Sequence, residues 1–162
     1  MGGDWSCAIQ KYTLVTFLHF FQDALNDHKL SLLFRRLTLS SSIQELSLYN
    51  NRLRTGIKSM VPFLQNASNL VELVLDANSI QSEGFNFLLV ALCDSPTLQL
   101  YCRNCDIESI HIDNDRYPTN LEALDLSLLS ENRINEDGCK GLVPSLFLYA
   151  TITTRWTAER WA

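Results

Sequence analysis

The stretch LVELVLDANSIQSEGFNFLLVAL, from Leu70 to Leu92, decides the fold because it contains one complete structural unit. Alternate residues of a strand point to opposite faces, so Leu73 and Leu75 face one way together. Gly84 permits backbone conformations that a side chain resists, and the apolar residues after it recur at the spacing of a helix. These residues are Phe85, Leu88, Leu89 and Leu92. The pattern predicts a strand followed by a helix, and such a unit needs a copy on each side to bury its apolar face.

Copies of the unit recur at a spacing of 27 residues. The positions Leu73, Leu75, Asn78 and Ile80 correspond to Leu46, Leu48, Asn51 and Leu53 in the copy before, and to Leu100, Cys102, Cys105 and Ile107 in the copy after. An asparagine amide both donates and accepts, so it can satisfy backbone groups that the turn leaves unpaired. Pro62, six residues after Gly56, should make the helix of the earlier copy begin late or bend.

A fourth copy departs from this spacing. It begins at Leu121, Leu124 and Leu126 and ends with Asn132 and Ile134. Three extra residues separate its leucines from its asparagine, and we interpret them as an insertion or an aberrant splice junction. The segment before it, Ile107–Leu121, shows no clear helical pattern.

The motif L-x-x-L-x-L-x-x-N-x-I, with a helix in each repeat, resembles the ribonuclease-inhibitor-type leucine-rich repeat proteins. The resemblance covers residues 43–146 and is most specific in LSLYNNRL and LVLDANSI. It implies an α/β leucine-rich repeat solenoid, with parallel strands on the concave side and helices on the convex side. Members of this family mostly bind other proteins through the concave face. One branch, the Ran GTPase-activating proteins, stimulates hydrolysis by a partner, but no residue of this chain could be matched to its functional positions.

Three parts are expected along the chain: a flexible N-terminus over 1–12, a leucine-rich repeat domain over 13–148 and a non-repeat tail over 149–162. Within the domain we expect a degenerate capping repeat over 13–42 and repeats from about 43, 70, 97 and 121. The apolar residues between 14 and 25 follow helical spacing, which predicts a helix at the start of the capping repeat. The stretch 30–39 aligns with 98–107 and is therefore expected to supply its strand. The alternative is that these two short stretches match by chance.

Composition excludes several classes of function. The chain has 162 residues, which suits one domain. Its net charge of −5 argues against nucleic acid as a partner, because phosphate recognition needs clustered basic residues. The apolar run Tyr12–Phe21 is too short to span a membrane, so we expect no stable membrane insertion and a cytoplasmic location. Gly2 and Ser6 fit a loose N-myristoylation pattern, and a plain disordered start is the favoured alternative.

Catalytic and metal chemistry find little support in the sequence, and we expect a non-enzymatic protein without a cofactor. Cys102 and Cys105 have the C-x-x-C spacing of zinc and thiol-exchange sites, but both occupy buried consensus positions, so apolar packing is the favoured interpretation. The five cysteines form an odd number, which indicates reduced thiols in a reducing compartment. Asp113 and Asp115 lack the glycine and distal glutamate of a calcium loop.

The candidate site is the strand face that points away from the core. Side chains on successive strands should align in three rows: Glu45, Glu72, Gln99 and Ala123; Ser47, Val74, Tyr101 and Asp125; and Tyr49, Asp76, Arg103 and Ser127. Aromatic and arginine side chains are frequent anchors of protein interfaces. The acidic residues in these rows favour a basic protein partner through electrostatic steering.

Two alternatives to a protein-binding scaffold stay open. One is a regulator of a GTPase or of another enzyme. The other is a fragment of a longer repeat protein without a function of its own, because no further repeat follows Leu146 and because Trp156 and Trp161 have no counterpart in any repeat.

Overall fold

The computed structural model describes residues 15–22, 25–38, 42–97, 99–111, 116, 118–126, 132–134 and 151–152. Several predictions fall outside these residues. They concern the N-terminus 1–12, Asp113 and Asp115, Ser127, the three-residue insertion, and Trp156 and Trp161.

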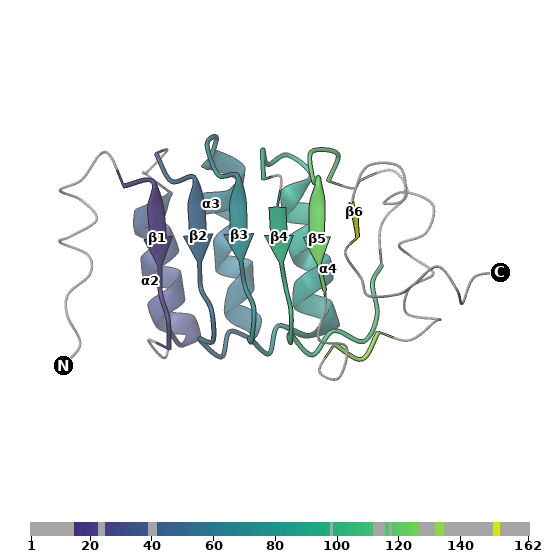
Figure 1. Cartoon of the computed structure of the whole chain (residues 1–162). Coiled ribbons are helices and arrows are strands. Elements are labelled where there is room, and N and C mark those ends of the chain that lie inside the picture. The colour runs from purple at the N-terminus through teal and green to yellow at the C-terminus, as the bar shows by residue number, and fades with distance from the viewer. Residues whose placement is uncertain are drawn as a thin grey trace.

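Six parallel strands form one sheet whose spatial order follows the order of the chain (Figure 1). The strands are β1 Phe17–His19, β2 Glu45–Ser47, β3 Glu72–Val74, β4 Gln99–Tyr101, β5 Ala123–Asp125 and β6 Thr151–Ile152. Leu46, Leu73 and Leu100 are register partners across three neighbouring strands. The prediction that these leucines lie side by side is therefore confirmed. β6 pairs with β5, so the sheet extends beyond the boundary expected at residue 148.

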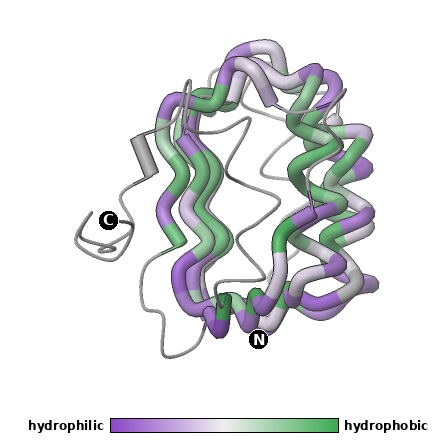
Figure 2. Tube along the Cα trace, turned by 90° about the vertical axis from the view of Figure 1, so that its right-hand side faces the viewer, coloured by the Kyte–Doolittle hydropathy of each residue, from purple (hydrophilic) through white to green (hydrophobic). Residues whose placement is uncertain are grey.

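The helices cover one side of this sheet (Figures 1 and 2). They are α2 Asp27–Leu37, the 3₁₀ helix η1 Thr55–Met60, α3 Val61–Asn66 and α4 Gln81–Leu92. Pro62 lies at the start of α3, where a missing N–H costs nothing, so the helix of this unit begins late, as predicted. Parallel strands need such return connections, and the chain is thus an α/β protein. In the part of the chain that the structure describes, no helix is long and apolar enough to cross a membrane.

The core lies between the sheet and the helices. The central leucines of β2, β3, β4 and β5 are fully buried, and so are Phe34, Phe63 and Phe85 from the helical layer. The rings of Phe34 and Phe63 pack with centroids 5.5 Å apart, which joins α2 to α3. Each buried side chain of this size stabilises the fold by about 1.5–3 kcal/mol, so the core depends on neighbouring units covering one another.

Asparagine side chains link the turns of neighbouring units. The Asn78 Oδ1 accepts hydrogen bonds from the backbone N–H of Asn51 at 2.9 Å and of Leu53 at 3.1 Å. Its Nδ2 donates to the carbonyls of Leu48 at 2.9 Å and Leu75 at 2.7 Å. Asn78 is buried, so these bonds replace water for backbone groups of two units at once.

Asn132 repeats this arrangement despite the longer segment before it. Its Oδ1 accepts from the N–H groups of Cys105 at 2.8 Å and Ile107 at 3.1 Å, and its Nδ2 donates to the Cys102 carbonyl at 2.7 Å. Asn132 therefore fills the asparagine position, as predicted. At the equivalent position of the unit between, the Cys105 thiol donates to the Leu75 carbonyl at 3.2 Å.

The turns after β1, β2, β3 and β4 each contain a residue in the left-handed conformation. These residues are Gln22, Asn50, Ala77 and Asn104, with φ of 53°, 55°, 55° and 56°. Asparagine tolerates this conformation better than alanine does. The described glycines have no positive φ, so the expectation that Gly84 supplies an unusual conformation is wrong. A Cβ at Gly84 would lie 2.8 Å from Cγ2 of Ile80 and 3.2 Å from Cγ2 of Ile57, so glycine is needed there for close packing.

Two predictions for the first unit are wrong. The predicted helix over 14–25 contains the strand β1, in which Leu18 pairs with Leu46 of β2. The predicted strand over 30–39 contains the helix α2, which buries Leu30, Leu33, Phe34 and Leu37. The Asn26 side chain caps this helix by accepting from the Lys29 N–H at 3.0 Å. The exposed Phe17 in β1 and Phe21 just after it contributed to an apolar period that resembled a helix.

The described part of the segment between β4 and β5 contains no helix, as predicted. It runs along α4 instead. The N–H groups of Glu108 and Ser109 donate to the Ser82 hydroxyl, each at 2.9 Å, and the His111 N–H donates to the Asn86 side chain at 2.9 Å. Polar side chains one turn apart on α4 thus take the place of a further helix.

Replacing Asn78 with alanine should lower the free energy of unfolding by at least about 3 kcal/mol, because several buried backbone groups lose their partners and each costs about 1–3 kcal/mol. Asn78→Cys should cost less, since Cys105 shows that a thiol is accommodated at this position. Urea denaturation of both variants measures the difference. Equal losses in the two variants would contradict the role assigned to the amide.

Ala77→Asn should raise the free energy of unfolding by about 0.5–1 kcal/mol, because asparagine adopts the left-handed conformation more readily. The neighbouring turns supply the matched controls: Asn50→Ala and Asn104→Ala should each lower it by a similar amount. Thermal unfolding followed by circular dichroism tests all three. A loss of stability in Ala77→Asn would show that turn conformation is not the limiting factor.

Candidate functional site

We call the side of the sheet opposite the helices the open face. It carries the three rows that the sequence predicts, and each row is extended at β1 by one further residue, Phe17, His19 or Phe21. The rows are Phe17, Glu45, Glu72, Gln99 and Ala123; His19, Ser47, Val74, Tyr101 and Asp125; and Phe21, Tyr49, Asp76 and Arg103. The strand register places all five members of each of the first two rows side by side. The third row follows from the backbone bonds that continue the ladder, in which Asn50 N donates to Asp76 O and Ala77 N to Arg103 O.

Asp76 and Arg103 are bonded to each other and fix the centre of the open face. Asp76 accepts from the Arg103 backbone N–H at 2.7 Å and from its Nε at 2.8 Å, and it also pairs with Nη2. This contact leaves Asp76 only 2% exposed. The carboxylate of Asp76, which the sequence places among the candidate protein-binding residues, therefore orients Arg103 instead of facing solvent.

Arg103 also lies against the neighbouring ring of Tyr101. Its guanidinium carbon is 5.7 Å from the ring centroid, a cation–π contact. Its Nε lies 3.9 Å from the carboxylate of Asp125. The hydrogen bond with Asp76 raises the pKa of Arg103, so this guanidinium stays charged between an aromatic ring and two carboxylates.

The first row brings two glutamates together. Glu45 and Glu72 are register partners on adjacent strands. The His19 Nε2 lies 2.6 Å from the Glu45 carboxylate. Burial raises the pKa of Glu72, and the charge of Glu45 raises it further, while His19 opposes the shift. Four carboxylates and one guanidinium on the open face leave three negative charges when His19 is neutral.

Aromatic side chains collect at the β1 end of the open face. Phe17 is 62% exposed, Phe21 59% and Tyr49 38%. The rings of Phe21 and Tyr49 are stacked, with centroids 5.2 Å apart and planes 11° from parallel. Exposed rings of this kind mark interaction surfaces. Sequence analysis found Tyr49 but missed Phe17, His19 and Phe21.

A signal for the missed residues exists in the sequence. LHFFQDAL, from Leu18 to Leu25, matches LSLYNNRL, from Leu46 to Leu53, at a spacing of 28 residues. In that alignment Phe21 corresponds to Tyr49. The match is hidden because phenylalanine and aspartate replace the consensus leucine and asparagine.

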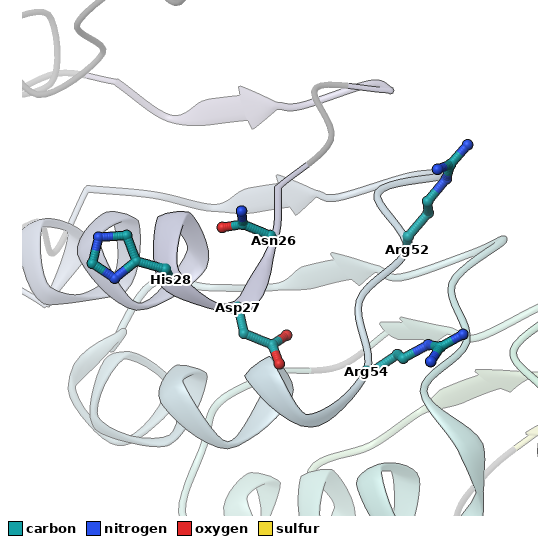
Figure 3. Close-up of a pocket in the computed structure, with 5 residues that line it drawn as sticks. All are labelled: Asn26, Asp27, His28, Arg52 and Arg54. Carbon is teal, nitrogen blue, oxygen red and sulfur yellow. The ribbon is translucent and has the colours of Figure 1, made fainter.

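A separate open hollow lies at the N-terminus of α2 and is lined by Asn26, Asp27, His28, Arg52 and Arg54 (Figure 3). Its side chains do not converge, since the two arginines extend away from His28. The Asp27 carboxylate accepts from the Gly56 N–H at 3.0 Å. A carboxylate at the helix terminus repels anions, so this hollow does not form an anion site.

The cysteine pair lies in the core. Cys102 and Cys105 are free thiols and fully buried, as predicted from their consensus positions. Burial raises the pKa of Cys102 well above that of an ordinary thiol, and the neighbouring Cys105 raises it further. A protonated, buried thiol is a poor nucleophile and metal ligand. Within the described ranges, no three histidine, cysteine, aspartate or glutamate side chains are grouped so as to hold a metal ion.

Comparison with models of known protein families finds no match to this chain, and comparison with curated proteins finds none either. The open face therefore has to be interpreted from its own geometry and charge.

Glu72→Gln should raise the free energy of unfolding at pH 7. The raised pKa of Glu72 means that losing its proton costs the folded state more than the unfolded state, so this carboxylate destabilises the fold as pH rises. Below the ordinary pKa of glutamate both states are protonated, so the gain should disappear at pH 3. Urea denaturation at the two pH values measures it.

Glu83 provides a control in which the expected change in the free energy of unfolding has the opposite sign, because the hydrogen bond with Lys58 lowers the pKa of Glu83. Glu83→Gln should reduce stability at pH 7, and this loss should also shrink on acidification. A destabilised Glu72→Gln variant at pH 7 would contradict the assignment of Glu72 as a disfavoured charge.

Proposed function

We propose that this chain is a leucine-rich repeat protein of the ribonuclease-inhibitor type, coiled as a solenoid, and that it binds another protein through the open face. The observation that carries the proposal is the alignment of exposed aromatic and charged side chains on the helix-free side of a sheet whose other side is a packed core. The repeat spacing and the linked asparagines support the repeat architecture.

The shape and chemistry of the open face favour a macromolecular partner over a small molecule. Its functional side chains lie in rows across several strands, whereas small ligands favour concave, mostly apolar pockets. Its excess of carboxylates disfavours nucleic acid and favours a basic protein. Tyr49, Tyr101 and Arg103 are residue types that commonly dominate binding free energy.

We also propose a reducing compartment such as the cytoplasm as the site of action. The three cysteines that the structure describes, Cys93, Cys102 and Cys105, are free thiols. Oxidising compartments favour paired cysteines, so this pattern supports an intracellular protein.

Photo-crosslinking from one residue on each side of the molecule tests the binding surface. A benzophenone side chain replaces Tyr49 on the open face, or Phe87 on α4, which has a similar exposure of 40% against 38% for Tyr49. Irradiation in cells that produce the protein should give specific adducts from position 49 and not from position 87. Equal adducts from both positions, or none from position 49, would contradict the proposal.

Side-chain truncation provides a second measurement, which again compares the open face with a control position on α4. The double variant Phe21→Ala with Tyr49→Ala should lose the protein adducts formed from a benzophenone at Val74, while Phe87→Ala should keep them. Asp76 and Arg103 are left intact, since removing either would expose the unpaired charge of the other. Circular dichroism checks that each variant is folded.

A further inference from the structure

We propose, building on the proposed function, that the β1 end of the open face receives a basic, extended segment of the partner protein, with an arginine at Glu45 and Glu72 beside Phe17 and an apolar side chain on the Phe21–Tyr49 stack. The class of ligand is thus an arginine-containing peptide segment.

The chain contains its own example of such recognition on the same face, at β4 and in the turns that follow β3 and β4. Arg103 is held by the Asp76 carboxylate and lies against the ring of Tyr101. A guanidinium suits this setting because it is planar, stacks on aromatic rings and bonds a carboxylate through two N–H groups. The same pair of partners, carboxylate and ring, recurs at the β1 end of the open face.

At the β1 end, the described residues supply the partners but not the guanidinium. Phe17 is the register partner of Glu45, and Glu45 of Glu72. No lysine or arginine among the described residues forms an ion pair with either glutamate; His19 contacts Glu45. An arginine from outside would offset the repulsion between the two carboxylates and cover the exposed ring.

The distance between the arginine site at Phe17 and the apolar contact at Phe21 and Tyr49 predicts how far apart the two ligand residues are. Phe17 and Phe21 are four residues apart, and a strand rises about 3.3 Å per residue, which places the two halves about 13 Å apart. An extended segment that follows β1 would therefore present its arginine and its apolar residue four positions apart. The stacked rings of Phe21 and Tyr49 offer that apolar residue a flat contact.

The probe is the blocked peptide Gly-Arg-Ser-Gly-Ser-Leu-Gly, titrated into the full-length protein at low salt and followed by NMR. Saturable shifts should appear at Phe17, Glu72 and Tyr49. The peptide with lysine in place of arginine should bind about two- to fivefold more weakly, since an ammonium lacks the planar stacking and the two-N–H contact of a guanidinium. The peptide with glutamate at that position should not bind measurably.

Variants with matched controls test the contribution of the carboxylates and of the Phe17 ring separately. Glu45→Gln with Glu72→Gln should weaken binding at least about threefold, while Glu83→Gln, which removes a charge on α4, should leave it unchanged. Phe17→Ala should reduce the preference for arginine over lysine, and Phe87→Ala should preserve it.

The results that overturn this inference are distinct from those that overturn the proposed function. Absence of saturable shifts, shifts confined to the helical side, or equal binding of the arginine and lysine peptides would overturn the arginine site. If a benzophenone at position 49 still gives protein adducts on irradiation, the proposed function stands without the arginine site. Loss of those adducts would remove both.

Discussion

Asn78 makes hydrogen bonds to backbone groups of its own unit and of the unit before it, and this constraint fixes how the two units lie against each other. Its acceptor oxygen serves two N–H groups of the preceding unit, and its donor nitrogen serves carbonyls of both units. Because each bond has a defined length and direction, neighbouring strands are held in one register. That register aligns the leucines on the core side, and it also aligns the rows of the open face.

The two sides of the sheet differ in composition because alternate residues of a strand face opposite sides. In β3, Leu73 is buried in the core while Glu72 and Val74 face the open side. The core side is uniform because every unit must cover its neighbours with apolar surface. The open side has no such requirement, so it can vary from strand to strand. The proposed binding function therefore depends on residues that core packing leaves free to vary.

Charge on the open face is partly satisfied within the chain and partly not. Arg103 is held among Asp76, Asp125 and Tyr101. On the adjacent strands β2 and β3, Glu45 and Glu72 lie side by side, and burial and the charge of Glu45 raise the pKa of Glu72. Two adjacent carboxylates do not stabilise a fold, and the proposed basic partner would offset their repulsion.

The first unit shows where sequence reasoning failed. β1 has three residues, and exposed phenylalanines flank the residues that enter the core. Alternation over so short a strand is easily mistaken for a helical period. The helix α2 had a clear signal in the spacing of its apolar residues and in its Asn26 cap. However, the helix predicted over 14–25 led to the alignment of 30–39 with a strand. As a result Phe17, His19 and Phe21 were absent from the predicted surface.

The sequence alone determined the strand-and-helix units around Leu46 and Leu73, their register, the buried asparagine positions and most of the surface rows. It could do so because apolar period and turn chemistry are local properties that are repeated at a fixed spacing. The tertiary structure decided that Asp76 is buried against Arg103, that Gly84 is needed for contact with Ile57, and that Phe21 stacks on Tyr49. These facts depend on distances between residues of different units, which no local pattern records.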